Sequence, residues 1–158
     1  MFVKNTLYPL KYESIVDEYS EEYGIDRYLI YAVIKGESNF NPKAISSKGA
    51  IGLMQLMQDT ADEIGEDIGI ESVDLYDEDT NIRIGVKYIF DLIDKYEGNI
   101  NLAIVAYNAG TGNVSKWIED GTIKKDGIDI ENVPYKETNM YVRRILNNYR
   151  IYRLLYND

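Results

Sequence analysis

The chain has 158 residues, of which 45% are hydrophobic and 28% are charged, and this composition predicts one globular domain that buries about two-thirds of its unfolded surface. It contains no His and no Cys, which excludes Ser-His-Asp and Cys-His catalytic sites, His- or thiolate-ligated metals and disulfides, so any catalysis must use carboxylates, hydroxyls, amides, Lys or Arg. The formal net charge of −10, without a basic run, argues against nucleic-acid binding.

Hydrophobic periodicity predicts an all-α fold of roughly seven to nine helices, without a convincing strand, repeat or low-complexity tract. Gly24 ends the first helical pattern, and Asp26 is a good N-cap for the second. Residues 39–52 contain Pro, Gly and Ser and indicate an ordered loop of the kind that lines a site. In chain order, the predicted helices are 11–23, 26–38, 60–64, 77–96, 101–108, 113–119 and 137–155.

Glu37 is the most informative residue, because it follows Ile30 and Val33 at helical spacing and a helix would carry its carboxylate onto its own apolar face. Loss of hydration and the negative end of the helix dipole both predict a raised pKa for this carboxyl group. An acid so placed can protonate a leaving group near neutral pH. A Glu that turns back to water at a helix end is the commoner case for an isolated residue, and the surrounding motifs favour the functional interpretation.

The run Asp77-Glu-Asp79-Thr-Asn81 has some features of a calcium-binding loop. However, Ile82 occupies the position of the Gly in such a loop, and Tyr88 that of the closing Glu. We therefore interpret the run as the capped first turn of a helix.

Four short motifs follow one another along the chain. They are Glu37-Ser38 with Asn41-Pro42 and Ala44; Gly49-Ala-Ile-Gly52-Leu-Met-Gln55-Leu-Met57; Ala106-Tyr-Asn-Ala-Gly110; and Glu137-Thr-Asn-Met-Tyr141-Val142. Together, from about Tyr8 to Tyr152, they closely resemble the catalytic domain of the soluble lytic transglycosylases. The resemblance implies a single lysozyme-like domain over residues 1–158, with a motif-bearing core at about 8–155, that acts on bacterial peptidoglycan.

By this resemblance Glu37 is the single catalytic acid/base, and the remaining motif residues bind the glycan substrate. The residues implied in substrate binding are Ser38, Ser46, Gln55, Met57, Tyr107, Asn108, Glu137 and Tyr141. One departure is visible, because Gln58 stands where the family usually has Pro. A Pro would pre-set the start of the next helix, so its replacement concerns local rigidity and not the chemistry.

Several of these residues also have a purely structural interpretation. Ser38 would hydrogen-bond the helix end, and Asn108 together with Gly110 would form a helix C-cap. For Met57 and Tyr141, a place in the core is as good an interpretation as a place in a groove.

Most glycosidases use two carboxylates, and the resemblance supplies one. It implies that the N-acetyl group of the substrate's N-acetylmuramic acid (MurNAc) assists, and that Glu37 first protonates the glycosidic oxygen and then accepts the proton of the C6 hydroxyl, which closes a 1,6-anhydro ring. No cofactor or metal is expected. The alternatives are a lysozyme-type muramidase, which would need a second acid from among Asp59, Asp62 and Glu63, and a non-catalytic glycan-binding wall-assembly protein.

The sequence contains no stretch close to the roughly 20 apolar residues of a membrane-spanning helix, and no secretory signal pattern. We expect a monomer, or a part of a larger wall-remodelling, conjugation or phage assembly, whose partner is the peptidoglycan glycan strand and not nucleic acid. The expected location is extracytoplasmic, with secretion or membrane tethering through a region absent from this chain. The 15 Tyr residues predict polar clefts of the kind that suits sugars.

Overall fold

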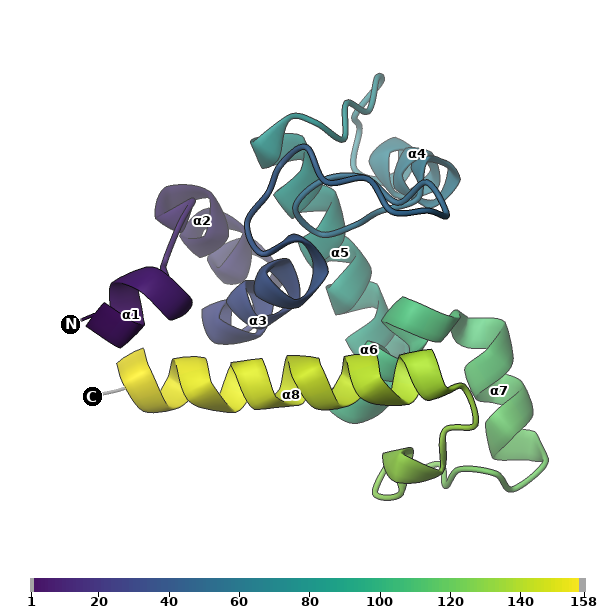
Figure 1. Ribbon diagram of the computed structural model, residues 1–158. Coiled ribbons are helices and arrows are strands. Elements are labelled where there is room, and N and C mark those ends of the chain that lie inside the picture. The colour runs from purple at the N-terminus through teal and green to yellow at the C-terminus, as the bar shows by residue number, and fades with distance from the viewer. Residues whose placement is uncertain (1, 157–158) are drawn as a thin grey trace. The chain divides into compact units, whose positions relative to one another are not determined.

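The computed structural model describes residues 2–156, and this part of the chain is helical, as the sequence predicts (Figure 1). Within that range no strand is formed, and Ile51 makes isolated bridges with Ile45 and Leu56. In chain order the elements are α1 (Phe2–Leu7), α2 (Glu13–Tyr23), α3 (Arg27–Ser38), α4 (Gln58–Asp67), α5 (Glu78–Lys95), α6 (Ile100–Ala109), α7 (Thr111–Glu119), the 3-10 helix η1 (Ile130–Asn132) and α8 (Lys136–Tyr156).

Capping residues set several of these boundaries where the sequence predicts them. Gly24 ends α2 with a left-handed φ of 64°. The Asp26 carboxylate accepts a hydrogen bond from the backbone N–H of Tyr28 at the start of α3 (2.9 Å). The Asp77 carboxylate accepts from the backbone N–H and the hydroxyl of Thr80 (2.9 and 2.8 Å). The interpretation of Asp77 as a helix cap is therefore confirmed.

Two helices differ from the prediction. The sequence does not predict a helix at α1, which lies close to the distant Tyr156: the hydroxyl of Tyr156 lies 3.1 Å from the carbonyl oxygen of Lys4 in this segment. Helix α4 begins at Gln58 and is longer than predicted. The Gln58 amide donates to the Asp62 carboxylate (2.8 Å) and to the Val73 carbonyl (3.3 Å). A side-chain amide thus fixes the helix start that a Pro would otherwise pre-set.

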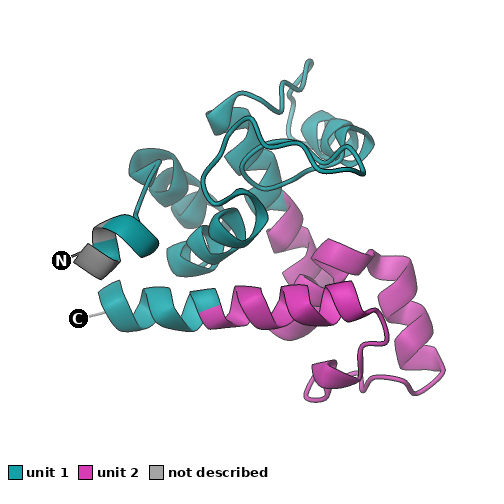
Figure 2. Ribbon diagram, in the orientation of Figure 1, with its two compact units in different colours: residues 1–87, 148–158 teal, residues 88–147 magenta. Residues whose placement is uncertain are grey.

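The chain divides into two compact units, which are coloured separately in Figure 2. Unit 1 comprises residues 1–87 and 148–158, and unit 2 comprises residues 88–147. Helices α5 and α8 each run from one unit into the other. The expectation of a single domain stays a prediction.

The core of unit 1 contains a cluster of tyrosines around the C-terminal turns of α8. The Tyr152 ring lies 5.5 Å from the ring of Tyr31 on α3 and 5.2 Å from that of Tyr8. Both Tyr31 and Tyr152 are fully buried, and the Tyr152 hydroxyl donates to the carbonyl of Pro9 (3.1 Å). Burial raises the pKa of Tyr31 to about 12. These tyrosines build the core of unit 1 and do not line a sugar-binding wall.

In unit 2, α6 packs against α7 and against η1. The Asn99 side chain accepts a hydrogen bond from the backbone N–H of Leu102 (3.0 Å) and caps α6. Its amide donates to the Asp126 carbonyl (2.6 Å), which connects the start of α6 to the segment before η1. The side chain of Trp117 on α7 is buried and meets the ring of Tyr135 edge-on, with the ring centroids 4.9 Å apart.

The loop between α3 and α4 approaches α5 very closely, and two glycines permit this. Gly52 in the loop has a φ of 78°, and a Cβ there would overlap the Asn81 amide and lie 2.5 Å from the Leu75 carbonyl oxygen. Gly85 lies one turn after Asn81 on α5, and a Cβ there would overlap the sulfur of Met54, a fully buried loop residue. The loop therefore depends on Gly at both positions.

Replacing Gly52 by Ala should lower the free energy of unfolding by about 2–4 kcal/mol, because a strained φ and a steric overlap act together. Gly49→Ala is the matched control: its φ is 87°, but nothing lies within 4 Å of the added Cβ, so only the backbone strain of about 1–2 kcal/mol applies. Urea denaturation of the two variants measures the difference. Equal losses would show that the close approach to α5 is unimportant.

Candidate active site

Glu37 lies in the last turn of α3, four and three residues after Val33 and Ile34. The side chains of these two residues are buried, with 2% and 0% exposed, and Glu37 itself is partly buried. The structure thus places Glu37 where the spacing predicts, on the side of α3 that faces the core and at the helix end where unpaired backbone carbonyls gather. Its catalytic role stays a prediction.

Ser38 connects the end of α3 to the loop that follows. Its hydroxyl lies 2.8 Å from the Leu53 carbonyl oxygen and 3.1 Å from that of Ile34, and it donates its one proton to this pair of acceptors. The interpretation of Ser38 as a residue that hydrogen-bonds the helix end is therefore confirmed. A contact with substrate would have to use the hydroxyl oxygen as an acceptor.

Ser46 and Gln55 hold the same loop through backbone groups. The Ser46 hydroxyl oxygen accepts from the backbone N–H of Ala50 (3.0 Å). The Gln55 amide nitrogen donates to the carbonyls of Ala44 (3.1 Å) and Gly52 (3.0 Å). Because both amide protons of Gln55 face carbonyl oxygens, its side-chain oxygen is the atom suited to accept a proton from a sugar hydroxyl.

The backbone of this region is unusual. Gln55 has a φ of 51°, and Asn39 and Phe40, directly after α3, have φ values of 48° and 65°. Left-handed conformations are uncommon for residues other than Gly, and they concentrate at functional sites. The conformation of Gln55 therefore supports a functional interpretation of its motif.

Met57 does not belong to the core, because 46% of it is exposed. It lies at the N-terminus of α4 with an extended backbone. The interpretation of Met57 as a core residue is wrong. The structure instead leaves a flexible apolar side chain exposed at this position, and its contact with substrate stays a prediction.

In unit 2, Tyr107 and Asn108 lie in the last turn of α6. The Tyr107 ring lies 5.1 Å from that of Tyr88 on α5 and is partly buried. Gly110 caps the helix, with its N–H donating to the Ala106 carbonyl (2.8 Å), while Asn108 is exposed. The cap thus comes from Gly110, and the exposed Asn108 amide is suited to contact a ligand.

Glu137 and Tyr141 lie one turn apart at the start of α8, and they differ in exposure. Glu137 is exposed, whereas only 3% of Tyr141 is accessible. The guanidinium group of Arg144 lies 5.5 Å from the Tyr141 ring centre. The burial of Tyr141 favours its structural interpretation, and its contact with substrate stays a prediction.

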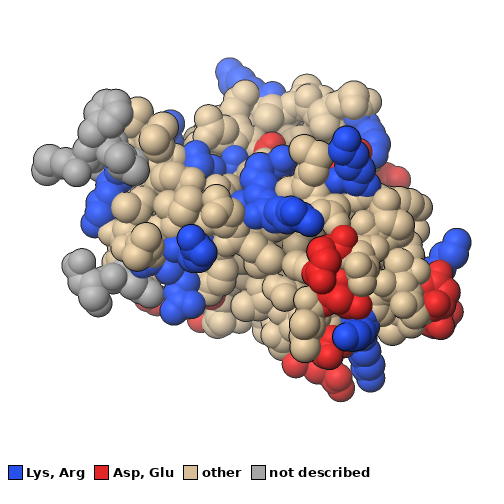
Figure 3. Space-filling view, turned by 60° about the horizontal axis from the view of Figure 1, so that its bottom comes forward, with Lys and Arg blue, Asp and Glu red and all other residues tan. Residues whose placement is uncertain are grey.

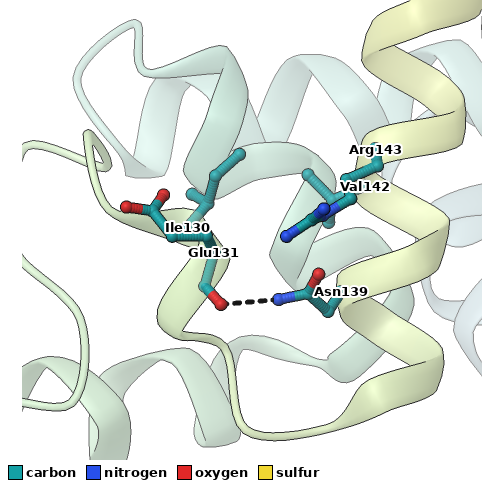
Figure 4. A pocket seen from close by; sticks show the side chains of 5 residues that line it. All are labelled: Ile130, Glu131, Asn139, Val142 and Arg143. Carbon is teal, nitrogen blue, oxygen red and sulfur yellow. Dashed lines mark hydrogen bonds between the residues drawn. The ribbon is translucent and has the colours of Figure 1, made fainter.

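A pocket of about 270 Å³ opens between η1 and the part of α8 that carries Asn139, Val142 and Arg143 (Figure 4). The Arg143 guanidinium points into it, and Ile130 and Val142 supply apolar lining. On the η1 side, the amide of Asn139 donates to the backbone carbonyl of Glu131 (2.8 Å). The pocket therefore has room for a polar ligand group, and α8, which supplies part of its lining, also carries Glu137.

The sequence interpretation missed one residue of this region, Asn81 on α5. Its side chain is fully buried, although Asn is polar. The sequence does contain an indication of this burial, because Asn81 lies on the apolar stripe of the predicted helix, one residue before Ile82 and four before Gly85. A polar residue in such a stripe indicates a buried hydrogen-bonding partner.

Among the described residues, no group of three or more His, Cys, Asp or Glu side chains is arranged to hold a metal ion. A search of the same residues for a helix with the length and apolar character of a membrane span finds no candidate. Figure 3 shows one face of the molecule, on which acidic and basic side chains lie among uncharged ones. The net charge of −10 therefore does not make this face uniformly acidic.

Known proteins resemble this chain over most of its length. The soluble lytic murein transglycosylase of Escherichia coli strain K12 is 32% identical over 156 residues, which cover 96% of this chain and 24% of that protein. The membrane-bound lytic murein transglycosylase C of Edwardsiella ictaluri is 32% identical over 172 residues, which cover 90% of this chain and 46% of that protein. The chain thus spans about a quarter to a half of the length of these relatives.

Solved structures agree with the sequence relatives. An inactive glutamate-to-glutamine mutant of the lytic transglycosylase Slt from Pseudomonas aeruginosa has a TM-score of 0.87 and 33% identity, covering 98% of this chain and 26% of that one. The 70-kDa soluble lytic transglycosylase of Escherichia coli has a TM-score of 0.85 and 32% identity, covering 96% of this chain and 25% of that one. The sequence model of the transglycosylase SLT domain family matches residues 14–129. The chain therefore belongs to the transglycosylase SLT domain family.

Proposed function

We propose that this domain is a peptidoglycan lytic transglycosylase that cleaves the β-1,4 bond between MurNAc and N-acetylglucosamine and leaves a 1,6-anhydro-MurNAc end. The observation that carries the proposal is the position of Glu37 at the end of α3. Glu37 is partly buried there and is followed by Ser38. The hydrogen bond from Ser38 to the Leu53 carbonyl joins the end of α3 to the loop that contains Gln55. Membership of the family and relatives named lytic murein transglycosylases support the proposal.

In the first step, protonated Glu37 donates its proton to the glycosidic oxygen. The bond from C1 of MurNAc to this oxygen breaks, and the N-acetylglucosamine end leaves as an alcohol. The carbonyl oxygen of the MurNAc 2-acetamido group stabilises the positive charge at C1 from the opposite face, so a second protein carboxylate is not needed.

In the second step, the ionised Glu37 accepts the proton of the C6 hydroxyl of the same sugar. The C6 oxygen bonds to C1 and closes the anhydro ring, and Glu37 returns to its protonated state. The attack is intramolecular, and its high effective concentration favours it over attack by water. No water molecule is consumed in the cycle.

Neutral polar groups of the chain suit the uncharged hydroxyl and acetamido groups of the glycan. The side-chain oxygen of Gln55 can accept from a sugar hydroxyl, and the exposed amide of Asn108 can both donate and accept. The exposed Met57 offers apolar surface to the face of a sugar ring. We also place the reaction where peptidoglycan lies, outside the cytoplasm.

The muramidase alternative would need a second acid, and the three candidates for it, Asp59, Asp62 and Glu63, lie on α4. All three are exposed, and the Asp62 carboxylate accepts a hydrogen bond from Gln58 (2.8 Å). An exposed carboxylate cannot easily place a water molecule in a site that excludes solvent. Their positions favour the mechanism with one carboxylate.

Replacing Glu37 by Gln should lower muralytic activity by at least about 10²–10⁴-fold, because Gln keeps the shape of the side chain but cannot donate or accept the transferred proton. A Glu-to-Gln mutant of one relative is inactive, which supports this expectation. Clearing of purified sacculi measures the rate, and a binding assay on glycan strands checks that the groove is intact. Glu63→Gln is the matched control and should keep its activity. Wild-type clearing by the Glu37 variant would remove Glu37 from its role.

Digestion of sacculi in ¹⁸O-labelled water should leave the MurNAc ends unlabelled, because the C6 oxygen and not water attacks C1. Mass spectrometry should show non-reducing 1,6-anhydro ends, each one water lighter than the corresponding hydrolysis product. Lysozyme digestion is the control and should give labelled reducing ends. If this domain also gave mainly labelled reducing ends, it would be a muramidase. Binding without cleavage would identify a glycan-binding protein.

A further inference from the structure

We infer that Asn81 is a positioning residue for Glu37. It fixes the position of Glu37 through the peptide group between Leu53 and Met54, in the loop between α3 and α4, and through Ser38. The inference rests on the proposed function, in which Glu37 is the catalytic acid. All the residues concerned lie in unit 1.

The Asn81 side chain is 0% exposed, and its amide uses each of its donors. The nitrogen donates to the carbonyl oxygens of Leu75 (2.9 Å) and Ile51 (3.1 Å). The oxygen accepts from the backbone N–H of Met54 (2.9 Å). Two carbonyls on one side and an N–H on the other allow only one orientation of the amide. Asn81 is therefore a rigid clamp on the loop.

The peptide group between Leu53 and Met54 transmits this constraint to α3. Its N–H donates to Asn81, and its carbonyl oxygen accepts from the Ser38 hydroxyl (2.8 Å). In a planar trans peptide the N–H and C=O point in opposite directions. Asn81 and Ser38 therefore hydrogen-bond the same rigid peptide group from opposite sides. Hydrogen bonds linked in this way also polarise and strengthen one another.

Ser38 is the last residue of α3, and Glu37 is the residue before it. The last turn of a helix frays when its carbonyls and side chains lack partners. The bond from Ser38 to the Leu53 carbonyl fixes this turn against the loop, and it requires that the peptide plane keep its orientation. Asn81 fixes that orientation. A displacement of about 1 Å in a reacting group can cost about 10²-fold in rate.

The test compares Asn81→Ala with Asn148→Ala. Asn148 is a second buried Asn of unit 1, 7% exposed, whose amide nitrogen lies 3.5 Å from the carbonyl oxygen of Ala32 in the middle of α3. This hydrogen bond joins Asn148 to α3 and not to the loop. Rates on a soluble glycan fragment are measured at a temperature at which both variants are folded, as shown by their thermal denaturation curves.

We expect Asn81→Ala to lower kcat by about 10-fold to 10²-fold with a smaller change in KM, because the acid is misplaced while the Gln55 side chain keeps its own hydrogen bonds to the carbonyls of Ala44 and Gly52. Asn148→Ala should keep nearly wild-type kcat. Asn81→Leu, which fills similar space without polar atoms, is the second variant in case Asn81→Ala does not fold, and its kcat should fall in the same way. Wild-type kcat in a folded Asn81 variant, an equal loss in Asn148→Ala, or failure of both Asn81 variants to fold would overturn the inference.

A double-mutant cycle with Ser38→Ala tests the route of the effect. If Asn81 acts through Ser38, then the loss of kcat in the double variant should be clearly smaller than the product of the two single losses. Fully multiplicative losses would show independent roles and would refute the route. Glu37→Gln on the same substrate separates the two hypotheses: if that variant is inactive and the Asn81 variants are not impaired, only the positioning role fails.

Discussion

The arrangement of unit 1 depends on a buried amide that lies between a helix and a loop without secondary structure of its own. A loop packed against a core must find partners for its backbone N–H and C=O groups, since an unpaired buried group costs about as much as a lost hydrogen bond. Asn81 supplies three such partners, and Gly52 and Gly85 provide the space for the close approach. The segment from Ile51 to Gln55 can therefore hold a fixed conformation beside the end of α3.

The motif residues of this loop serve two purposes at once. Ser38, Ser46 and Gln55 each satisfy backbone groups, and this holds the loop in place. After these bonds are made, what Ser38 and Gln55 can offer a ligand is mainly oxygen acceptors. A chain without His or Cys has few ways to do proton chemistry, and one carboxylate next to Ser38, which is bonded to the loop, is consistent with a substrate that supplies its own second group.

Tyrosine illustrates how composition can mislead about location. The 15 Tyr residues suggested sugar-binding walls, yet Tyr31 and Tyr152 are fully buried in unit 1. A buried Tyr is tolerated when its hydroxyl reaches a partner, and the hydroxyls of Tyr152 and Tyr156 donate to the carbonyls of Pro9 and Tyr8. The same amphipathic character that suits a glycan thus also suits the junction between the last helix and the N-terminal segment.

The sequence by itself determined the helical class, most helix positions, the caps at Gly24, Asp26 and Asp77, and the place of Glu37 on the core side of α3, because periodicity and capping act within one or two turns of chain. It did not determine that Met57 is exposed, that Tyr141 is buried or that Gln58 fixes a helix start. Only the tertiary structure decided the role of Asn81, whose partners Met54 and Ile51 lie 27 and 30 residues away in sequence. A local pattern shows that a polar residue falls on an apolar stripe, but the hydrogen bonds that make its burial favourable exist only once distant segments meet.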